Sequence, residues 1–137
     1  MPDSAATVLD ARAKLRRAMR FGVVGATGTA VNTAVLYLLA RGVGLPIPVS
    51  SALAVELAIT SNYLLNDRWT FATRRPSFRR FAKFNLASLA GLCLNVTTVW
   101  LLTRSGVYFL AANLVGIAAA VVANYVFSVA WVWRKVA

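Results

Sequence analysis

The chain has 137 residues, a formal net charge of +11, no histidine and a single cysteine, Cys93. Hydrophobic residues make up 59% of it and charged residues only 14%, whereas soluble domains contain about 25% charged residues. The polar residues therefore cannot cover a water-soluble globule, and the length leaves no room for a separate catalytic domain beside membrane spans. The cysteine and histidine counts exclude an intrachain disulfide, a His/Cys zinc site and catalysis by an imidazole.

Four apolar segments are long enough to cross a bilayer, which takes roughly 20 residues for about 30 Å of hydrocarbon. Their backbone groups must pair within each segment in lipid, so we expect helices. The basic start before the first segment could suggest a signal peptide, but the apolar run is too long and no cleavage motif follows it. We therefore predict an all-α membrane protein with four transmembrane helices, at residues 21–40, 49–65, 84–103 and 107–133.

The N-terminal segment and the connections differ in composition. Residues 1–19 form a basic cytoplasmic segment, which precedes a four-helix domain at residues 20–137. A surface helix and a disordered tail both remain open for this segment. The connection at residues 41–48 is rich in Gly and Pro, which stop and restart helices, whereas residues 104–106 form a tight turn and residues 66–83 a longer basic loop.

Lys and Arg are distributed unevenly between the two sides of the predicted bundle. Thirteen of the fifteen lie in residues 1–20, the 66–83 loop and the C-terminus, and only Arg41 and Arg104 lie on the other side. This bias places both termini in the cytoplasm. Because the charges flank apolar runs, we expect them to contact anionic lipids and not nucleic acid.

The two halves of the sequence resemble each other. A shift of 63 residues places Gly28 on Gly91, Asn32 on Asn95 and Arg41 on Arg104. The loop after Arg104 is one residue shorter than the loop after Arg41, so the later matches follow a shift of 62 residues. They pair Asn62 with Asn124, Trp69 with Trp131, and Phe71 with Trp133. Each half has an even number of spans, so we interpret the chain as two parallel two-helix repeats.

Small and polar residues share one face of the first and third spans. Gly25, Gly28 and Asn32 are repeated by Ser88, Gly91 and Asn95. Small residues allow close helix packing, and Asn can form hydrogen bonds between helices. Two interpretations remain open: these residues stabilise the packing of the helices, or Asn32 and Asn95 line a polar path.

Glu56 is the one carboxylate inside a predicted span. An intramembrane carboxylate costs several kcal/mol unless it is paired or protonated, so it is a functional candidate by default. It could carry a proton or contact a sugar hydroxyl, or it could be a protonated group bonded to a neighbouring carbonyl or Asn. Its repeat counterpart is Ala118, so any role is asymmetric.

The stretch NYLLNDRWTF, residues 62–71, ends the second span. Asn62 and Asn66 lie on one helical face, and Arg68 could hold a phosphate through its planar fork. Trp69 and Phe71, with their counterparts Trp131 and Trp133, are predicted to anchor helices at the membrane interface. Ordinary anchoring explains the aromatic residues, whereas Arg68 with the two Asn residues favours a ligand site.

These features resemble the GtrA-like family. The matching residues are RFGVVGATGT (residues 20–29), Asn32 and NYLLNDRWTF, and the resemblance covers about residues 20–135. Asp67 departs from the neutral or basic residue that is frequent at this position in the family. The resemblance implies a multi-pass protein of the bacterial plasma membrane that handles a polyprenyl-phosphate-linked monosaccharide for cell-surface polysaccharide synthesis, beside a membrane glycosyltransferase. One intramembrane carboxylate gives no acid/base pair, and the sequence has no metal-ligand cluster or nucleophile motif, so we expect no cofactor and no enzymatic activity.

The leading hypothesis is translocation of this lipid-linked sugar. Arg20, Arg68 and Lys83 would bind the phosphate, and the polar residues that would meet the sugar or line its path are Asn32, Glu56, Asn62, Asn66, Asn95 and Asn124. Four helices enclose little volume, so a homo-oligomer is plausible. The alternative is an adaptor that recruits a glycosyltransferase without transport. A small multidrug transporter fits poorly because Glu56 lies in the second span and the charge bias prevents dual insertion.

Overall fold

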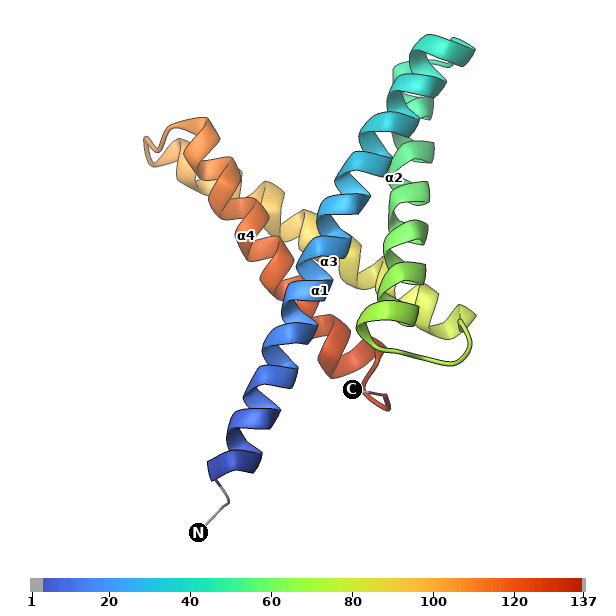
Figure 1. Ribbon diagram of the computed structural model, residues 1–137. Coiled ribbons are helices and arrows are strands. Elements are labelled where there is room, and N and C mark those ends of the chain that lie inside the picture. The colour runs from blue at the N-terminus through green and yellow to red at the C-terminus, as the bar shows by residue number, and fades with distance from the viewer. Residues whose placement is uncertain (1–3, 137) are drawn as a thin grey trace. The chain divides into compact units, whose positions relative to one another are not determined.

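The computed structural model describes residues 4–136, and these residues form helices and connecting loops without a strand. The all-helical fold class is therefore confirmed. The segments are α1 (Ser4–Tyr37), η1 (Leu38–Val43), α2 (Ile47–Leu65), η2 (Asn66–Thr70), α3 (Phe78–Arg104), α4 (Phe109–Phe127) and η3 (Ser128–Val132), where η denotes a π-helical turn (Figure 1).

Three helices in the described chain are long and apolar enough to cross a membrane: Thr7–Val43, Phe78–Arg104 and Phe109–Val132. They contain the first and third predicted spans and all but the ends of the fourth, which was predicted at residues 107–133. The second predicted span is also helical, as α2, but Glu56 and several Ser, Thr and Asn residues make it more polar. The protein is therefore a multi-pass membrane protein, and the full count of four spans stays a prediction.

The basic N-terminal segment is helical from Ser4 and continues into the first span without a break. The segment is therefore helical from Ser4, as a continuation of the first span, and a location at the membrane surface stays a prediction. Residues 1–3 lie outside the described part. The 34 residues of α1 extend for about 51 Å at 1.5 Å per residue, which exceeds the hydrocarbon thickness. An ion pair of 2.7 Å between Lys14 and Asp10 supports its exposed first part.

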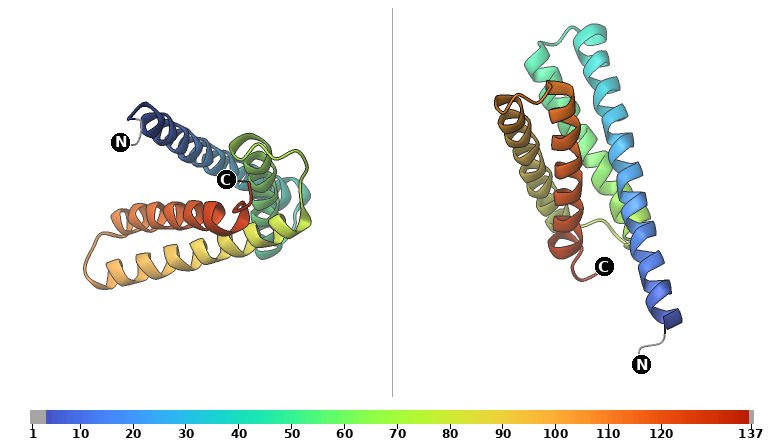
Figure 2. Two further views of the ribbon diagram at one scale, coloured as in Figure 1. Left: turned by 90° about the horizontal axis from the view of Figure 1, so that it is seen from below. Right: turned by 90° about the vertical axis from the view of Figure 1, so that its left-hand side faces the viewer.

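The first of two compact units, Met1–Pro76, contains α1, η1, α2 and η2. In it α1 and α2 pack as an antiparallel hairpin, and α1 continues past the end of α2 (Figures 1 and 2). Ser50, Ala54 and Ala58 are buried at four-residue intervals along α2. Such small side chains let helix backbones approach closely in a membrane. Gly28 on α1 is part of the same contact, because a Cβ there would lie 2.3 Å from the Asn62 amide nitrogen.

The second unit, Ser77–Ala137, contains α3, α4 and η3. Its two long helices also form an antiparallel hairpin (Figure 2). Small residues again lie at the contact: a Cβ on Gly91 would lie 3.4 Å from the carbonyl oxygen of Ala120, and one on Gly116 would meet Asn95. Large apolar side chains of both units, such as Leu53 and Leu86, stay exposed, as expected for surfaces that face lipid.

Candidate functional site

Arg20 and Trp69 meet at one end of the first unit. The Arg20 Nη1 group donates a hydrogen bond of 3.1 Å to the backbone carbonyl oxygen of Trp69. Its guanidinium carbon also lies 5.3 Å from the centre of the Trp69 ring, within the range of a cation–π contact. One turn earlier, Arg17 lies 5.8 Å from the ring of Phe71. The turn η2 thus brings two aromatic residues back onto the cationic face of α1.

Lys83 and Trp131 repeat this arrangement in the second unit. The Lys83 Nζ group donates a hydrogen bond of 3.3 Å to the carbonyl oxygen of Trp131 and lies 5.1 Å from its ring centre. Both tryptophan side chains are partly exposed, 45% for Trp69 and 42% for Trp131. All four residues are candidates from the sequence, but their pairing could not be predicted from it. The sequence does contain a sign of these two pairs: the cation and the tryptophan are 49 residues apart in the first unit and 48 residues apart in the second.

Hydrogen bonds between polar side chains stabilise the turn that carries Trp69. Thr70 Oγ1 donates a hydrogen bond of 2.7 Å to Asn66 Oδ1, and Thr73 Oγ1 donates one to a carboxylate oxygen of Asp67. Asn66 is 1% exposed and Asp67 is fully buried. Asp67, which departs from the family pattern, therefore closes the turn. Asn66, expected at the sugar, also belongs to this turn.

Arg68 lies beside Trp69 in η2 and its side chain is exposed. The structure therefore places it next to the Arg20–Trp69 pair along the chain, while its side chain stays accessible. Lys83 belongs to the second unit. The predicted phosphate contacts thus comprise one cation held against a tryptophan in each unit, together with the exposed Arg68.

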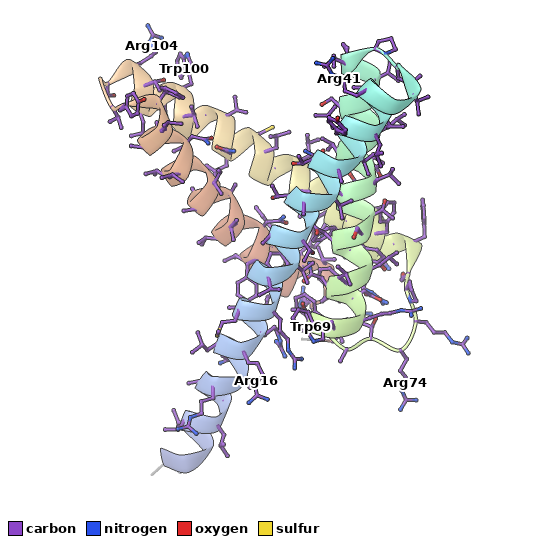
Figure 3. All side chains as sticks on the ribbon, turned by 45° about the horizontal axis from the view of Figure 1, so that its top comes forward. Arg16, Arg41, Trp69, Arg74, Trp100 and Arg104 are labelled. Atoms are coloured by element: carbon purple, nitrogen blue, oxygen red, sulfur yellow. The ribbon has the colours of Figure 1, made fainter. Side chains whose placement is uncertain are left out.

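The other ends of the two hairpins carry few cations. Figure 3 shows Arg41 at the opposite end of the first unit from Trp69, whereas Arg74 lies at the Trp69 end. In the second unit Arg104 lies 4.9 Å from the Trp100 ring at the end of α3, away from Lys83 near its start (Figure 3). Cations therefore concentrate at one end of each hairpin, as the sequence-based charge count predicted.

Four asparagines lie in the seams of the hairpins. The Oδ1 atoms of Asn32, Asn62, Asn95 and Asn124 are buried and have no hydrogen-bond partner among the residues that the structure describes. One asparagine comes from each long helix, and three of them, Asn62, Asn95 and Asn124, lie close to a glycine of the facing helix. A buried acceptor without a partner is costly, above all in lipid. These oxygens can therefore accept hydrogen bonds from a polar ligand or from water.

Glu56 lies on a different face of α2. It is exposed, whereas Ala54 and Ala58 on either side of it are buried in the first unit. Residues two positions apart point to nearly opposite sides of a helix. The structure therefore does not bring Glu56 into the seam that holds the Asn62 oxygen.

The predicted interface anchors fall into two groups. Trp69 and Trp131 are partly exposed, as an anchor requires, but Phe71 is 5% exposed and Trp133 is fully buried. The latter two side chains are buried because the chain folds back after each π-helical turn, and their role as interface anchors stays a prediction. Their backbone N–H groups bond at 2.9 Å to the carbonyl oxygens of Asn66 and Ser128. Trp133 then packs edge-on against Phe84, with ring centres 5.6 Å apart.

Comparisons with known proteins agree with the resemblance drawn from the motifs. The model of the GtrA/DPMS transmembrane domain matches residues 20–133. The chain is also 38% identical over 117 residues to a dolichol-phosphate mannosyltransferase of Pyrococcus furiosus, which covers 84% of this chain. The matched part of this chain spans only 33% of the length of that mannosyltransferase. Because the family model covers most of the sequence, the chain belongs to the GtrA/DPMS transmembrane-domain family.

Proposed function

We propose that this chain moves a polyprenyl-phosphate-linked monosaccharide across the bacterial plasma membrane for the synthesis of surface glycans. The observation that carries the proposal is the fixed Arg20 side chain, which lies at the cation-rich end of the first hairpin. A guanidinium has five N–H donors in a planar fork, and the bond to Trp69 uses one of them. The remaining donors suit the oxygens of a phosphate.

The proposed topology places this end of each hairpin at the cytoplasmic surface, with both termini inside. The charge bias favours this orientation. In the first unit Arg20 and Arg68 would then bind a phosphate at the cytoplasmic leaflet. In the second unit Lys83 would bind a phosphate at the same leaflet. Anionic lipids are also expected to collect beside these cations.

The proposed path for the sugar follows the buried asparagines. Sugar hydroxyls can donate hydrogen bonds to the amide oxygens of Asn32, Asn62, Asn95 and Asn124, which have no partner in the structure. Matching positions and contacts in the two hairpins support the interpretation as two parallel repeats. Glu56 would reach the sugar only where another helix covers the outer face of α2, and we propose a homo-oligomer as one way to supply it.

A second candidate function is that of an adaptor for a membrane glycosyltransferase. The named relative is a mannosyltransferase, and two thirds of its length have no counterpart in this chain. We propose that this chain is not itself an enzyme, because its one carboxylate inside a predicted span gives no acid/base pair. Recruitment would depend on the cationic surface of the N-terminal helix and the 66–83 loop. It would not depend on the buried asparagines.

Reconstitution in vesicles tests the proposed translocation. Radiolabelled polyprenyl-phosphate mannose is incorporated into both leaflets, and a membrane-impermeant oxidant then destroys the sugar that is exposed outside. We expect oxidation to go to completion with the protein and to stop at the outer-leaflet share in protein-free vesicles. Oxidation that stops at this share with folded protein would exclude translocation. Capture of a purified glycosyltransferase under those conditions would then favour the adaptor.

A further inference from the structure

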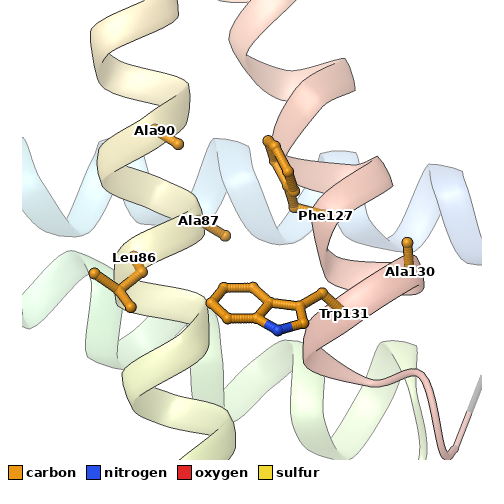
Figure 4. A pocket seen from close by; sticks show the side chains of 6 residues that line it. All are labelled: Leu86, Ala87, Ala90, Phe127, Ala130 and Trp131. Carbon is orange, nitrogen blue, oxygen red and sulfur yellow. The ribbon is translucent and has the colours of Figure 1, made fainter.

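An apolar pocket lies beside the Lys83–Trp131 pair in the second unit. It has a volume of about 460 Å³ and opens between α3 and the end of the α4–η3 helix. Figure 4 shows the Trp131 indole reaching from η3 towards α3, with Phe127 on the next turn of the same helix. The lining residues are all apolar or aromatic: Leu86, Ala87, Ala90, Phe127, Ala130 and Trp131.

We infer that this pocket holds the first isoprene units of the polyprenyl chain while Lys83 binds the phosphate to which they are attached. The inference rests on the proposed function and assigns a part of the ligand that the predicted headgroup contacts leave out. Trp131 links the two parts of the site, because its ring lines the pocket and its carbonyl oxygen and ring hold the Lys83 ammonium. A cation beside an apolar pocket complements a lipid with a single phosphate on an isoprenoid chain.

The size of the pocket suits a short stretch of such a chain. A cavity of about 150 Å³ holds the six carbons of benzene. By this measure a pocket of about 460 Å³ has room for roughly three five-carbon units. The large side chains on its wall are Leu86, Phe127 and Trp131, which are 59%, 45% and 42% exposed. Their apolar surface is therefore available to the methyl branches of an isoprenoid.

The corresponding positions in the first unit have a different chemistry. Arg68 occupies the position of Ala130, Thr27 that of Ala90, and Val24 that of Ala87. The first unit therefore has a cation and a hydroxyl where the second unit has small apolar side chains. Only the second unit combines a tryptophan-held cation with an apolar wall at these positions, so the tail is assigned to this unit.

Filling the pocket tests the inference. Ala90→Phe and Ala130→Phe place a ring in the pocket from two different helices, and both parent residues are exposed, so each variant is expected to fold. Ala118→Phe is the matched control, because Ala118 is an exposed residue of α4 that does not line the pocket. Binding of undecaprenyl phosphate to the full chain in nanodiscs is measured for each variant, with helix content checked by circular dichroism.

We expect both pocket variants to weaken undecaprenyl phosphate binding about tenfold, because several buried apolar groups lose their contacts, and the control to bind like wild type. Dioleoyl phosphatidic acid, which carries the same phosphate on two acyl chains, should bind equally to all four proteins. Unchanged undecaprenyl phosphate binding in both pocket variants would overturn the inference. An equal loss for phosphatidic acid would also overturn it, because the pocket would then accept acyl chains in general.

The vesicle assay separates this inference from the proposed function. Transport by wild type together with unchanged binding in the pocket variants removes the tail site and leaves translocation intact. Pocket-dependent binding without transport by wild type supports the tail site and excludes translocation.

Discussion

Arg20 contacts Trp69 twice, through a hydrogen bond of 3.1 Å to its carbonyl oxygen and through its ring at 5.3 Å. The hydrogen bond depends on where η2 places the backbone of Trp69, and the ring contact depends on the rotamer of the Trp69 indole. Together they hold a long, flexible side chain in the middle of α1 before any ligand arrives. Such preorganisation reduces the entropy that is lost when a phosphate binds.

The first prediction concerns the guanidinium of Arg20. Arg20→Ala should weaken binding of a polyprenyl phosphate about tenfold, since a hydrogen bond to a charged group contributes about 1.5–3 kcal/mol. Arg20→Lys should recover only part of this loss, because an ammonium lacks the planar fork. The measurement is a binding titration in nanodiscs.

Arg12→Ala is the control for this prediction, since Arg12 lies on the exposed first part of the same helix. Equal losses for Arg12→Ala and Arg20→Ala would show that only the overall positive charge matters, and the fixed geometry would then have no role in binding.

The second prediction separates the two roles considered for the asparagines. Asn95→Leu should leave the free energy of unfolding unchanged or raise it, because the buried Oδ1 atom has no partner in the structure and an apolar group of similar shape removes that cost. Transport should nevertheless fall. Denaturant titration followed by circular dichroism and the vesicle assay measure the two effects.

If Asn95 instead glues the helices together, the same substitution lowers stability by about 1 kcal/mol and transport falls only as much as the folded fraction does. Asn124→Leu examines the partner helix of the same hairpin and should behave in the same way as Asn95→Leu.

Much of the helical architecture could be predicted from the sequence, because long apolar runs in lipid have few structural alternatives. The matched positions of Asn32 and Asn95, or of Trp69 and Trp131, could also be found by a simple shift. The burial of Phe71 and Trp133 could not, since it depends on π-helical turns whose extra residue redirects the chain. No local pattern in the sequence marks such a turn.

The residues of the candidate site could be predicted from the sequence, but the contacts between them could not. Arg20 and Trp69 are separated by 49 residues, so only the packed hairpin brings them together. The apolar pocket was missed for a similar reason, because Ala87, Ala90 and Ala130 give no signal until the helices that carry them are paired. For Glu56 the sequence predicted a position within a span, but it did not predict the face of the helix on which the side chain lies.

The third prediction concerns the close approach of the helices at glycine. Gly116→Ala should destabilise the protein by about 1–3 kcal/mol, as overpacking does, because the new Cβ would lie 3.0 Å from the Asn95 backbone oxygen and also from Val99. Gly28→Ala should cost less, since its contacts are all with the Asn62 side chain, which can turn away. Gly22→Ala is the control, with nothing within 4 Å. A denaturant titration that ranks Gly22→Ala as the most harmful would contradict the packing described for both hairpins.

The fourth prediction concerns membrane topology, which the charge bias indicates. Cys93 is the single cysteine, so Cys93→Ser gives a background in which one new cysteine at a time reports its location. Lys14→Cys and Arg74→Cys should react with a membrane-impermeant maleimide only after the cell membrane is opened. Arg41→Cys and Arg104→Cys, at the other ends of the two hairpins, should react in intact cells. Labelling of residue 41 from one side and residue 104 from the other would require antiparallel units, and the interpretation as two parallel repeats would then be wrong.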